Sequence, residues 1–248
     1  MLTIYQKLLL RKSAPLLNYQ TSFSRLFIDS KPSYFFFKRV FDLVFSVFVM
    51  VFILSWFVPL LGIIIKMDSR GTVFFLQRRI GKGGRIFLCI KFRTMTQNME
   101  ADTKQAVEND YRITRVGKLL RMCSIDELPQ FINVFLGQMS VIGPRPHMLS
   151  DCRKFSELVP GYKFRNFVRP GITGLAQIKG YRGLSKDHRN ILRRFQYDAF
   201  YIRNTNFGLD LRIIRVTVAQ VTIALFKNKK KRRSLEPKKS EKYGKIAA

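Results

Sequence analysis

The sequence predicts an α/β (α+β) protein in which an apolar membrane segment precedes a compact domain with a small sheet. Three observations predict this class. An almost wholly apolar run extends from Val40 to Ile65, two strand-like segments occupy 73–77 and 85–92, and the later segments repeat apolar residues at helical spacing. A chain of 248 residues, 47% of them hydrophobic, is long enough to bury one core beside such an accessory.

The charge balance indicates an anionic partner. Forty-five Lys and Arg residues against 16 Asp and Glu residues leave a formal charge of +29. Phospholipid headgroups, nucleotides and nucleic acid all fit this charge, and composition does not choose among them. The three cysteines are far apart and predict reduced thiols, and two histidines are too few for a typical zinc site.

Residues 1–37 are basic and aromatic and do not resemble a signal peptide, and the segment at 38–66 is expected to enter the membrane. The almost wholly apolar run at 40–65 is 26 residues long and exceeds the roughly 20 residues that cross a bilayer core. Basic residues flank both ends, and Pro59 should bend or break the helix. The residues alone leave two interpretations open, a kinked spanning helix and a re-entrant hairpin that returns to the same side.

Residues 67–226 are expected to form the folded domain. The two strands are separated by a glycine-rich turn at 81–84, and a polar stretch at 97–110 predicts a surface helix or loop. The segments expected to be helical are 113–123, 126–139, 186–203 and 208–226. Turn-rich loops are expected at 141–146 and 168–177, and the basic tail at 227–248 is expected to lack fixed structure.

Adjacent acids, Asp126 and Glu127, stand near the beginning of a predicted helix and follow a basic stretch. Helix N-termini favour anions, so two carboxylates beside several arginines suit a phosphate together with a divalent cation. One carboxylate could hold Mg²⁺ while the other attacks a phosphoryl group. A simpler interpretation is that Ser124 is an N-cap, that Glu127 completes its capping box and that Asp126 only decorates the first turn.

Further basic residues occupy conformationally restricted positions. Arg145 lies between two prolines, Arg169 precedes Pro-Gly, and Lys91 and Arg93 close the second strand. Arginine presents a planar fork that matches phosphate oxygens. Each of these residues alone is usually a solvated surface charge, but together they suggest a phosphate site.

The run SIDELPQFINVFLGQMSVIGPRPH at 124–147 resembles the signature of the bacterial sugar transferases, the monotopic phosphoglycosyl transferases. Matching segments follow one another in order over about 34–226. They are KRVFD (38–42), DSRGTVFFLQRRIG (68–81), KFRTM (91–95), ITRVGKLLR (113–121), VRPGITGLAQIKGYRG (168–183) and the YD…YI…LDLRII pattern (197–214).

The resemblance implies the site and its chemistry. Asp126 is expected to be the nucleophile that attacks the β-phosphorus of a UDP-sugar, and Glu127 is expected to help bind Mg²⁺. The reaction implied is transfer of a hexose-1-phosphate to undecaprenyl phosphate through an aspartyl phosphosugar, with release of UMP. The substrate-binding residues expected are Lys91, Arg93, Arg121, Arg145, Arg169, Gln177 and Asp198.

The resemblance also favours the re-entrant helix, with a break expected near Pro59, and a catalytic domain on the cytoplasmic face of the bacterial inner membrane. Two positions depart from the family pattern. Ser55 is followed by Trp56 instead of proline, and Ala176 stands where tryptophan is common. The donor expected is UDP-glucose or UDP-galactose, with an N-acetylated or diamino sugar as the alternative.

The expected partners are therefore a UDP-sugar, undecaprenyl phosphate and anionic membrane lipids, and no nucleic acid. Two other functions account for part of the sequence. A membrane-tethered basic binding protein explains the charge but leaves the acid pair without a role. A lipid-phosphate phosphatase shares the lipid substrate but needs no UDP-sugar. Glycan pathway and oligomeric state are not determined by the sequence.

Overall fold

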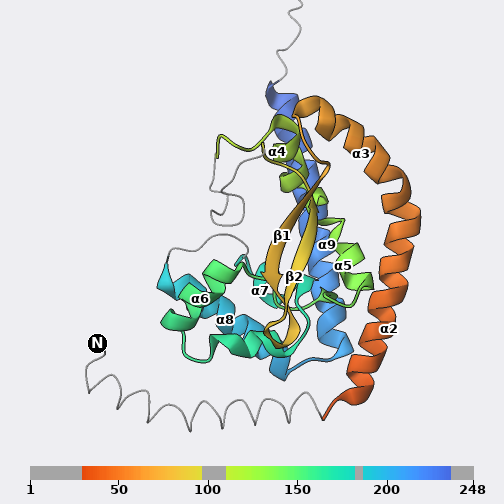
Figure 1. Cartoon of the computed structure of the whole chain (residues 1–248). Helices are drawn as coiled ribbons and strands as arrows, with labels where there is room; N and C mark the ends of the chain where they lie inside the picture. The colour runs from red at the N-terminus through yellow and green to blue at the C-terminus, as the bar shows by residue number, and fades with distance from the viewer. Residues whose placement is uncertain (1–29, 97–109, 182–186, 236–248) are drawn as a thin grey trace, which may run out of the picture.

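The computed structural model describes residues 30–96, 110–181 and 187–235, with side chains described as far as 226. Most of the N-terminal segment, the polar stretch at 97–109 and the end of the basic tail therefore lie outside the described residues. In Figure 1 a long bowed helix runs along one side of a mixed domain that contains a β-hairpin and several shorter helices.

The bowed helix consists of α2 (Pro32–Val49), a π-helical turn η1 (Met50–Leu54) and α3 (Ser55–Asp68). It is continuous over 37 residues and is long and apolar enough to cross a membrane. The break expected at Pro59 is wrong, because Pro59 lies inside α3. The irregular turn comes earlier, where the Ser55 N–H donates to Met50 O five residues back. This extra residue in the turn lets the helix bend without interruption.

Helix α2 turns most of its polar residues toward the domain, and the outward face of the bowed helix is apolar. The buried positions of α2 recur every three or four residues and are Tyr34, Lys38, Asp42, Ser46 and Val49. The outward face is rich in exposed phenylalanine and valine, for example Phe37, Val44, Phe48 and Phe52. A helix of a water-soluble protein has the reverse arrangement.

Buried polar contacts attach α2 to the domain. Asp42 Oδ1 accepts hydrogen bonds from Ser140 Oγ (3.1 Å) and the Val141 N–H (2.9 Å). The Lys38 ammonium lies 2.7 Å from Asp210 Oδ2, at the start of the last helix. The buried side chains of Lys38 and Asp42 are thus both paired, as a low-dielectric environment requires.

The other end of the bowed helix is attached as well. The Arg93 guanidinium donates to Ser69 O (2.6 Å) and Arg70 O (2.7 Å), just beyond α3, and is only 4% exposed. Asp68 Oδ2 accepts a hydrogen bond from the Val116 N–H at 3.1 Å. Both ends of the apolar helix are therefore held by the same domain.

The predicted hairpin is confirmed. Strand β1 (Phe74–Ile80) pairs antiparallel with β2 (Ile86–Phe92), from Phe74 opposite Phe92 to Ile80 opposite Ile86. The turn between them is the 3-10 segment η2 (Lys82–Gly84), in which Gly83 and Gly84 have φ values of +66° and +79° that favour glycine. Asn133 extends the open edge of β2, because its amide accepts from the Ile90 N–H and donates to Leu88 O.

The two turn-rich loops contain a second, unpredicted pairing. Strand β3 (Ser140–Ile142) runs parallel to β4 (Gly171–Thr173). A Cβ on Gly171 would lie 2.0 Å from the Gly143 nitrogen, so the close approach of the two chains requires glycine there. The loops are rigid because they are hydrogen-bonded to each other.

The remaining elements are helical, and they differ in length from the prediction. They are α4 (Arg115–Met122), η3 (Ile125–Glu127), α5 (Gln130–Phe135), α6 (Leu149–Leu158), η4 (Tyr162–Phe167), α7 (Leu175–Ile178), α8 (His188–Arg203) and α9 (Phe207–Leu235). Helix α5 is shorter than the segment expected at 126–139. Helix α9 continues into the basic stretch that was expected to lack structure. Neither α6 nor η4 was predicted.

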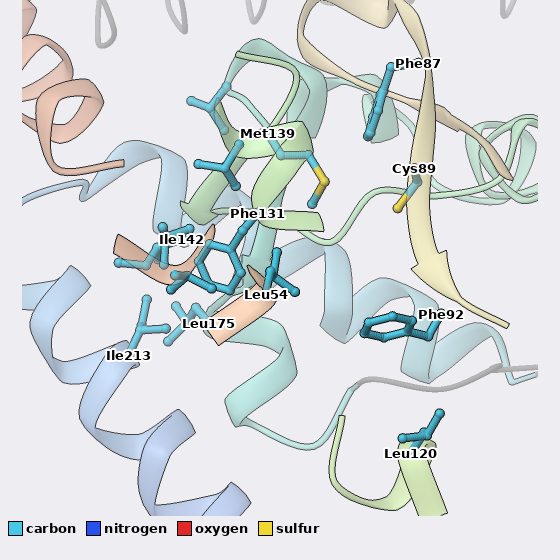
Figure 2. Packing of buried hydrophobic residues seen from close by; sticks show 14 of the residues in the cluster. Leu54, Phe87, Cys89, Phe92, Leu120, Phe131, Met139, Ile142, Leu175 and Ile213 are labelled. Atoms are coloured by element: carbon cyan, nitrogen blue, oxygen red, sulfur yellow. The ribbon is translucent and has the colours of Figure 1, made fainter. Parts of the chain in front are cut away.

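A large cluster of buried apolar residues joins most of these elements, and a smaller cluster, which includes Phe155, Tyr162 and Ile191, packs α6, η4 and α8 together. Figure 2 shows members of the large cluster from the bowed helix, the hairpin, α5 and α9, with Leu54, Phe131, Ile142, Leu175 and Ile213 gathered together. Leu54, in the π-helical turn, is part of this cluster and is 5% exposed. The bowed helix is thus integral to the core even though most of its surface is exposed.

The contacts of Arg93 lead to a prediction about stability. Lysine cannot reach both carbonyl groups beyond α3, so Arg93→Lys should lower the free energy of unfolding by roughly 2–3 kcal/mol. For a domain of this size that corresponds to a fall in Tm of roughly 5–10 °C. Thermal unfolding in detergent measures it, with Arg78→Lys on the exposed side of β1 as the matched control. An unchanged Tm would mean that these hydrogen bonds do not hold the helix end.

Candidate active site

A cavity of about 690 Å³ opens between the hairpin, η3, the loop at 143–148 and helices α7 and α9. Its wall contains both members of the acid pair, Asp126 and Glu127. The basic residues in the wall include Lys91, Arg121 and Arg145. The volume is in the range of pockets that hold nucleotide-sized ligands.

The acid pair stands on a tight 3-10 turn and not in a capping box. Ser124 has a φ of +55°, in the left-handed region, and its side chain makes no capping hydrogen bond. The Glu127 side chain points away to other partners, so the capping-box interpretation is wrong. A strained residue two positions before the acid pair is typical of functional turns.

Glu127 is held by two cations from distant parts of the chain. Lys91 Nζ, at the end of β2, donates to Glu127 Oε1 at 2.8 Å. The Arg145 guanidinium donates to Glu127 Oε1 (2.5 Å) and Oε2 (3.2 Å) as a fork. Burial alone would raise the pKa of Glu127, but Arg145 and Lys91 together lower it well below the ordinary value. Glu127 is therefore ionised over the whole physiological pH range.

Asp126 differs from its neighbour. It is 9% exposed and, among the described residues, takes part in no hydrogen bond or ion pair. Burial raises its pKa to about 6; Glu127 adds to this rise, while Lys91 and Arg121 oppose it. A carboxylate in the cavity wall without a fixed partner is free to react with a ligand.

Arg121 and Gln177 also lie where a ligand could reach them. Arg121 Nε donates to Thr94 Oγ1 at 2.7 Å, which fixes the direction of its guanidinium on the cavity wall. Gln177 lines the same cavity from α7, and its Nε2 donates to Ile172 O at 3.0 Å. The structure thus brings Lys91, Arg121, Arg145 and Gln177 to one cavity with the acid pair.

Three other expected substrate-binding residues have different surroundings. Arg93 touches the cavity wall, but its guanidinium nitrogens contact carbonyl groups at the end of α3. Arg169 donates from Nε to Gly137 O (2.9 Å), and Asp198 is 2% exposed and paired with Arg165. Neither Arg169 nor Asp198 is among the described residues that line the cavity, so direct substrate contact by these two is not what the geometry supports.

A family profile for bacterial sugar transferases matches residues 33–224 of this chain. The match covers well over half of the sequence.

The chain belongs to the bacterial sugar transferase family.

Curated relatives agree. The chain is 47% identical to the UDP-glucose:undecaprenyl-phosphate glucose-1-phosphate transferase of Klebsiella pneumoniae over 184 residues, 73% of this chain and 39% of the relative. It is 41% identical to the UDP-N-acetylgalactosamine-undecaprenyl-phosphate N-acetylgalactosaminephosphotransferase of Aeromonas hydrophila, over 77% of this chain and 44% of the relative. It is 42% identical to the exopolysaccharide production protein PSS of Rhizobium leguminosarum, over 73% of this chain and 92% of the relative. The chain thus spans less than half of the first two relatives.

Sequence reasoning missed several residues of this sugar transferase's cavity. Phe75, Gln77 and Arg79 are every second residue of β1, so they share one side of the strand, and all three line the cavity. The two-residue period of a strand could therefore have predicted that Gln77 and Arg79 lie together. His147 follows the Pro-Arg-Pro motif directly. Arg194 of α8 and Thr217 of α9 carried no local signal, because only the packing of their helices brings them to the site.

The two positions that depart from the family pattern also have defined places. Ala176 is 4% exposed in α7, and its carbonyl accepts a hydrogen bond from the Tyr181 N–H. Ser55 Oγ donates to Val51 O, and the Trp56 indole donates to Phe52 O, so both side chains satisfy carbonyl groups next to the π-helical turn. Pro59 is exposed on α3 and lies far from the acid pair in sequence.

The raised pKa of Asp126 predicts a pH-dependent cost in stability. Folding raises this pKa from its ordinary value near 4, so the neutral form is favoured in the fold. The associated stability is present below pH 4 and is lost as the pH rises through about 6. Asp126→Asn stays neutral, so its advantage in unfolding free energy over the wild type should grow across this window, by up to about 3 kcal/mol.

Tm values from pH 4 to pH 8, without added divalent cations, measure this difference. The control is Glu157→Gln on the exposed side of α6, which should follow the wild type at every pH. Parallel pH profiles for Asp126→Asn and the wild type would show that Asp126 is not a destabilised carboxylate.

Proposed function

We propose that this chain transfers a hexose-1-phosphate from a UDP-sugar to undecaprenyl phosphate, with Asp126 as the nucleophile. The observation that carries the proposal is the contrast within the acid pair. Glu127 is paired with Lys91 and Arg145, whereas Asp126, in the cavity wall with Arg121, has no hydrogen-bond or ion-pair partner among the described residues. The printed names of the relatives supply the two substrates.

In the first step an Asp126 carboxylate oxygen attacks the β-phosphorus of the UDP-sugar. The bond between this phosphorus and the oxygen bridging to the α-phosphate breaks, and UMP leaves with that oxygen. A carboxylate is a weak nucleophile, so the phosphorus must be activated by positive charge around its oxygens. Lys91, Arg121 and Arg145 supply that charge from three different elements.

In the second step a phosphate oxygen of undecaprenyl phosphate attacks the same phosphorus. The acyl-phosphate bond to Asp126 breaks, the carboxylate is regenerated, and undecaprenyl diphosphate-sugar is formed. The acceptor oxygen is already anionic near neutral pH, so no general base is required. Both displacements occur at the same phosphorus, so the same three cations can stabilise both transition states. One compact cluster of basic residues is therefore enough for the whole reaction.

Mg²⁺ fits the donor set in its usual manner, with one or two carboxylates and several phosphate oxygens. No described residue pairs with the Asp126 carboxylate, and Glu127 Oε2 accepts one hydrogen bond from Arg145, which leaves a lone pair available. Asp126 and Glu127 would hold the ion together with the diphosphate. When bound, Mg²⁺ would neutralise charge on the leaving phosphate.

The donor we propose is UDP-glucose, with UDP-galactose as the next choice. Several relatives are named as glucose-1-phosphate transferases, including that of Xanthomonas campestris at 48% identity over 159 residues. The relative from Aeromonas hydrophila is named for an N-acetylated sugar, so the panel of donors must include one. The relative named for exopolysaccharide production suggests that the product enters an extracellular glycan.

We also propose that the bowed helix is re-entrant and that the domain stays on one side of the membrane. Both ends of the helix are attached to the same domain, through Lys38 and Asp42 at one end and Arg93 at the other. A helix that spans the bilayer would place its ends on opposite sides. UDP-sugars are made in the cytoplasm, so the domain would face the cytoplasm at the inner membrane, where its positive charge meets anionic lipids.

The first test is UMP release with undecaprenyl phosphate, Mg²⁺ and a panel of UDP-sugars. The wild type should release UMP with one preferred donor, and Asp126→Asn should lose at least about 10³-fold in rate because no covalent intermediate can form. Removal of Mg²⁺ with EDTA should also abolish release, and added Mg²⁺ should restore it. The matched control is Asp187→Asn, an exposed N-cap remote from the acid pair in sequence.

Three other results would speak against the proposal. If no donor yields UMP, the chain would still belong to the family but would lack the proposed activity. Release that survives Asp126→Asn would remove Asp126 as nucleophile. Inorganic phosphate released from undecaprenyl phosphate alone would indicate a lipid phosphatase.

The membrane arrangement is tested by single cysteines at the two ends of the bowed helix, Ser33→Cys and Arg70→Cys, both at exposed positions. A membrane-impermeant maleimide should label both from the cytoplasmic side in inside-out vesicles, and neither in intact spheroplasts. The unsubstituted chain sets the background, since Cys123 is partly exposed. Labelling of the two cysteines from opposite sides would establish a spanning helix.

A further inference from the structure

The loop that carries Arg145 is held by a donor at each of three consecutive carbonyl groups. The Arg145 carbonyl accepts from Arg165 Nη2 (2.6 Å), and the Pro146 carbonyl accepts from Arg79 Nη1 (3.1 Å). The His147 carbonyl accepts from the Ile80 N–H (3.1 Å). These donors come from η4 and β1, so the loop is fixed from two directions.

Arg165 is itself fixed by a buried carboxylate. Its Nε lies 3.1 Å and its Nη2 2.9 Å from Asp198 Oδ2, on helix α8. Arg165 is 4% exposed and Asp198 is 2% exposed. The guanidinium is planar, so a carboxylate on one edge determines where the remaining N–H groups point. Nη2 therefore contacts both Asp198 and the Arg145 carbonyl.

His147 adds a second support behind the same loop. Its Nδ1 lies 2.7 Å from the Tyr162 hydroxyl, and its Nε2 lies 3.4 Å from Arg194 Nη1. Arginine can only donate, so Nε2 is the acceptor and Nδ1 carries the proton toward Tyr162. Burial and the surrounding arginines lower the pKa of His147 well below its ordinary value, which keeps the ring neutral.

A buried ion pair is costly to form and is weak evidence for stability, so its presence here calls for a role. Among the described residues, those lining the large cavity include Arg145 but neither Arg165 nor Asp198. The pair ends on the backbone of the residue whose side chain forms the fork with Glu127. Its geometry therefore acts on the site through Arg145.

We propose that Asp198 and Arg165 are positioning residues that set the place of Arg145 on Glu127. The reaction demands this precision, because a misplacement of about 1 Å at a phosphate-binding cation can cost about 10²-fold in rate. The kinetic part of the proposal rests on the proposed function, whereas the structural part does not. Asp198, which the sequence predicted to bind substrate directly, would instead act through Arg165 and Arg145.

The structural part is tested by amide hydrogen exchange in the full-length chain. The N–H groups of Ile80 and Gly171 donate to the carbonyls of His147 and Pro144, so they report whether the loop is fixed. In Arg165→Lys their exchange should accelerate about 10-fold or more. The Arg93 N–H, which donates to Val73 O, should keep its rate. Unchanged exchange at Ile80 and Gly171 would overturn the proposal even if the wild type releases no UMP.

The kinetic part is tested by coupling. Arg165→Lys should lower kcat by about 10²-fold with KM for the UDP-sugar changed less than about threefold. Arg145→Lys alone should be at least as impaired, and adding Arg165→Lys to it should cost less than about twofold more, because the second residue acts only through the first. Losses that multiply would show an independent role for Arg165 and overturn the proposal.

Two further variants separate positioning from folding. Arg203→Lys, exposed on the same helix as Asp198, is the control and should retain kcat. Thermal unfolding of every variant corrects the rates for the folded fraction. If Arg165→Lys does not fold, Asp198→Asn, which keeps the shape and removes the charge, replaces it with the same expected results. A kcat loss fully accounted for by unfolded protein would mean that the ion pair is only structural.

Discussion

The contact between Glu127 and its two cations joins the parts of this molecule on which the site depends. Lys91 ends the hairpin, Arg145 belongs to the loop after β3, and Glu127 stands on the short turn before α5. Burying an ionised carboxylate without partners would cost on the order of several kcal/mol of folding free energy. These three segments must therefore meet if Glu127 is to be buried. Asp126, one residue earlier, lies in the cavity wall and has no ion-pair partner in the part of the chain that the structure describes. The roles proposed for the two carboxylates follow from this difference in their partners.

The bowed helix imposes a second constraint on the whole molecule. Its polar face, with Lys38 and Asp42, is buried against the domain, and its apolar face is left outside. The domain cannot detach from the helix without exposing buried charges, and the helix cannot leave an apolar environment without exposing phenylalanine and valine to water. If the apolar face lies in a membrane, the domain is therefore held at a fixed position relative to the membrane surface. For the reaction proposed above, between a soluble nucleotide sugar and a lipid phosphate, this position would bring both substrates to one site.

Arginine is used in this structure chiefly as a connector. Arg93 contacts carbonyl groups beyond α3, Arg39 contacts those of Val134 and Phe135 at the end of α5, and Arg165 contacts that of Arg145. Each exploits several N–H groups in one plane to link elements that are far apart in sequence. Part of the charge of +29 that suggested an anionic partner thus also serves the fold. Composition cannot separate these two uses, because both require the same side chain.

The sequence by itself determined the apolar segment, the hairpin with its glycine turn, several helices and the acid pair with its surrounding cations. These features depend on local periodicity, on turn chemistry or on the family motif around Asp126, and all of these are contained in short stretches of chain. Only the tertiary structure decided that Glu127 pairs with Lys91 and Arg145 instead of capping a helix. It likewise decided that Arg93 and Asp198 support other elements, and that the loops at β3 and β4 pair with each other. Such contacts join residues that are 18 to 36 positions apart. Which of many possible partners a charged side chain meets is therefore set by the packing of whole elements and not by its neighbours along the chain.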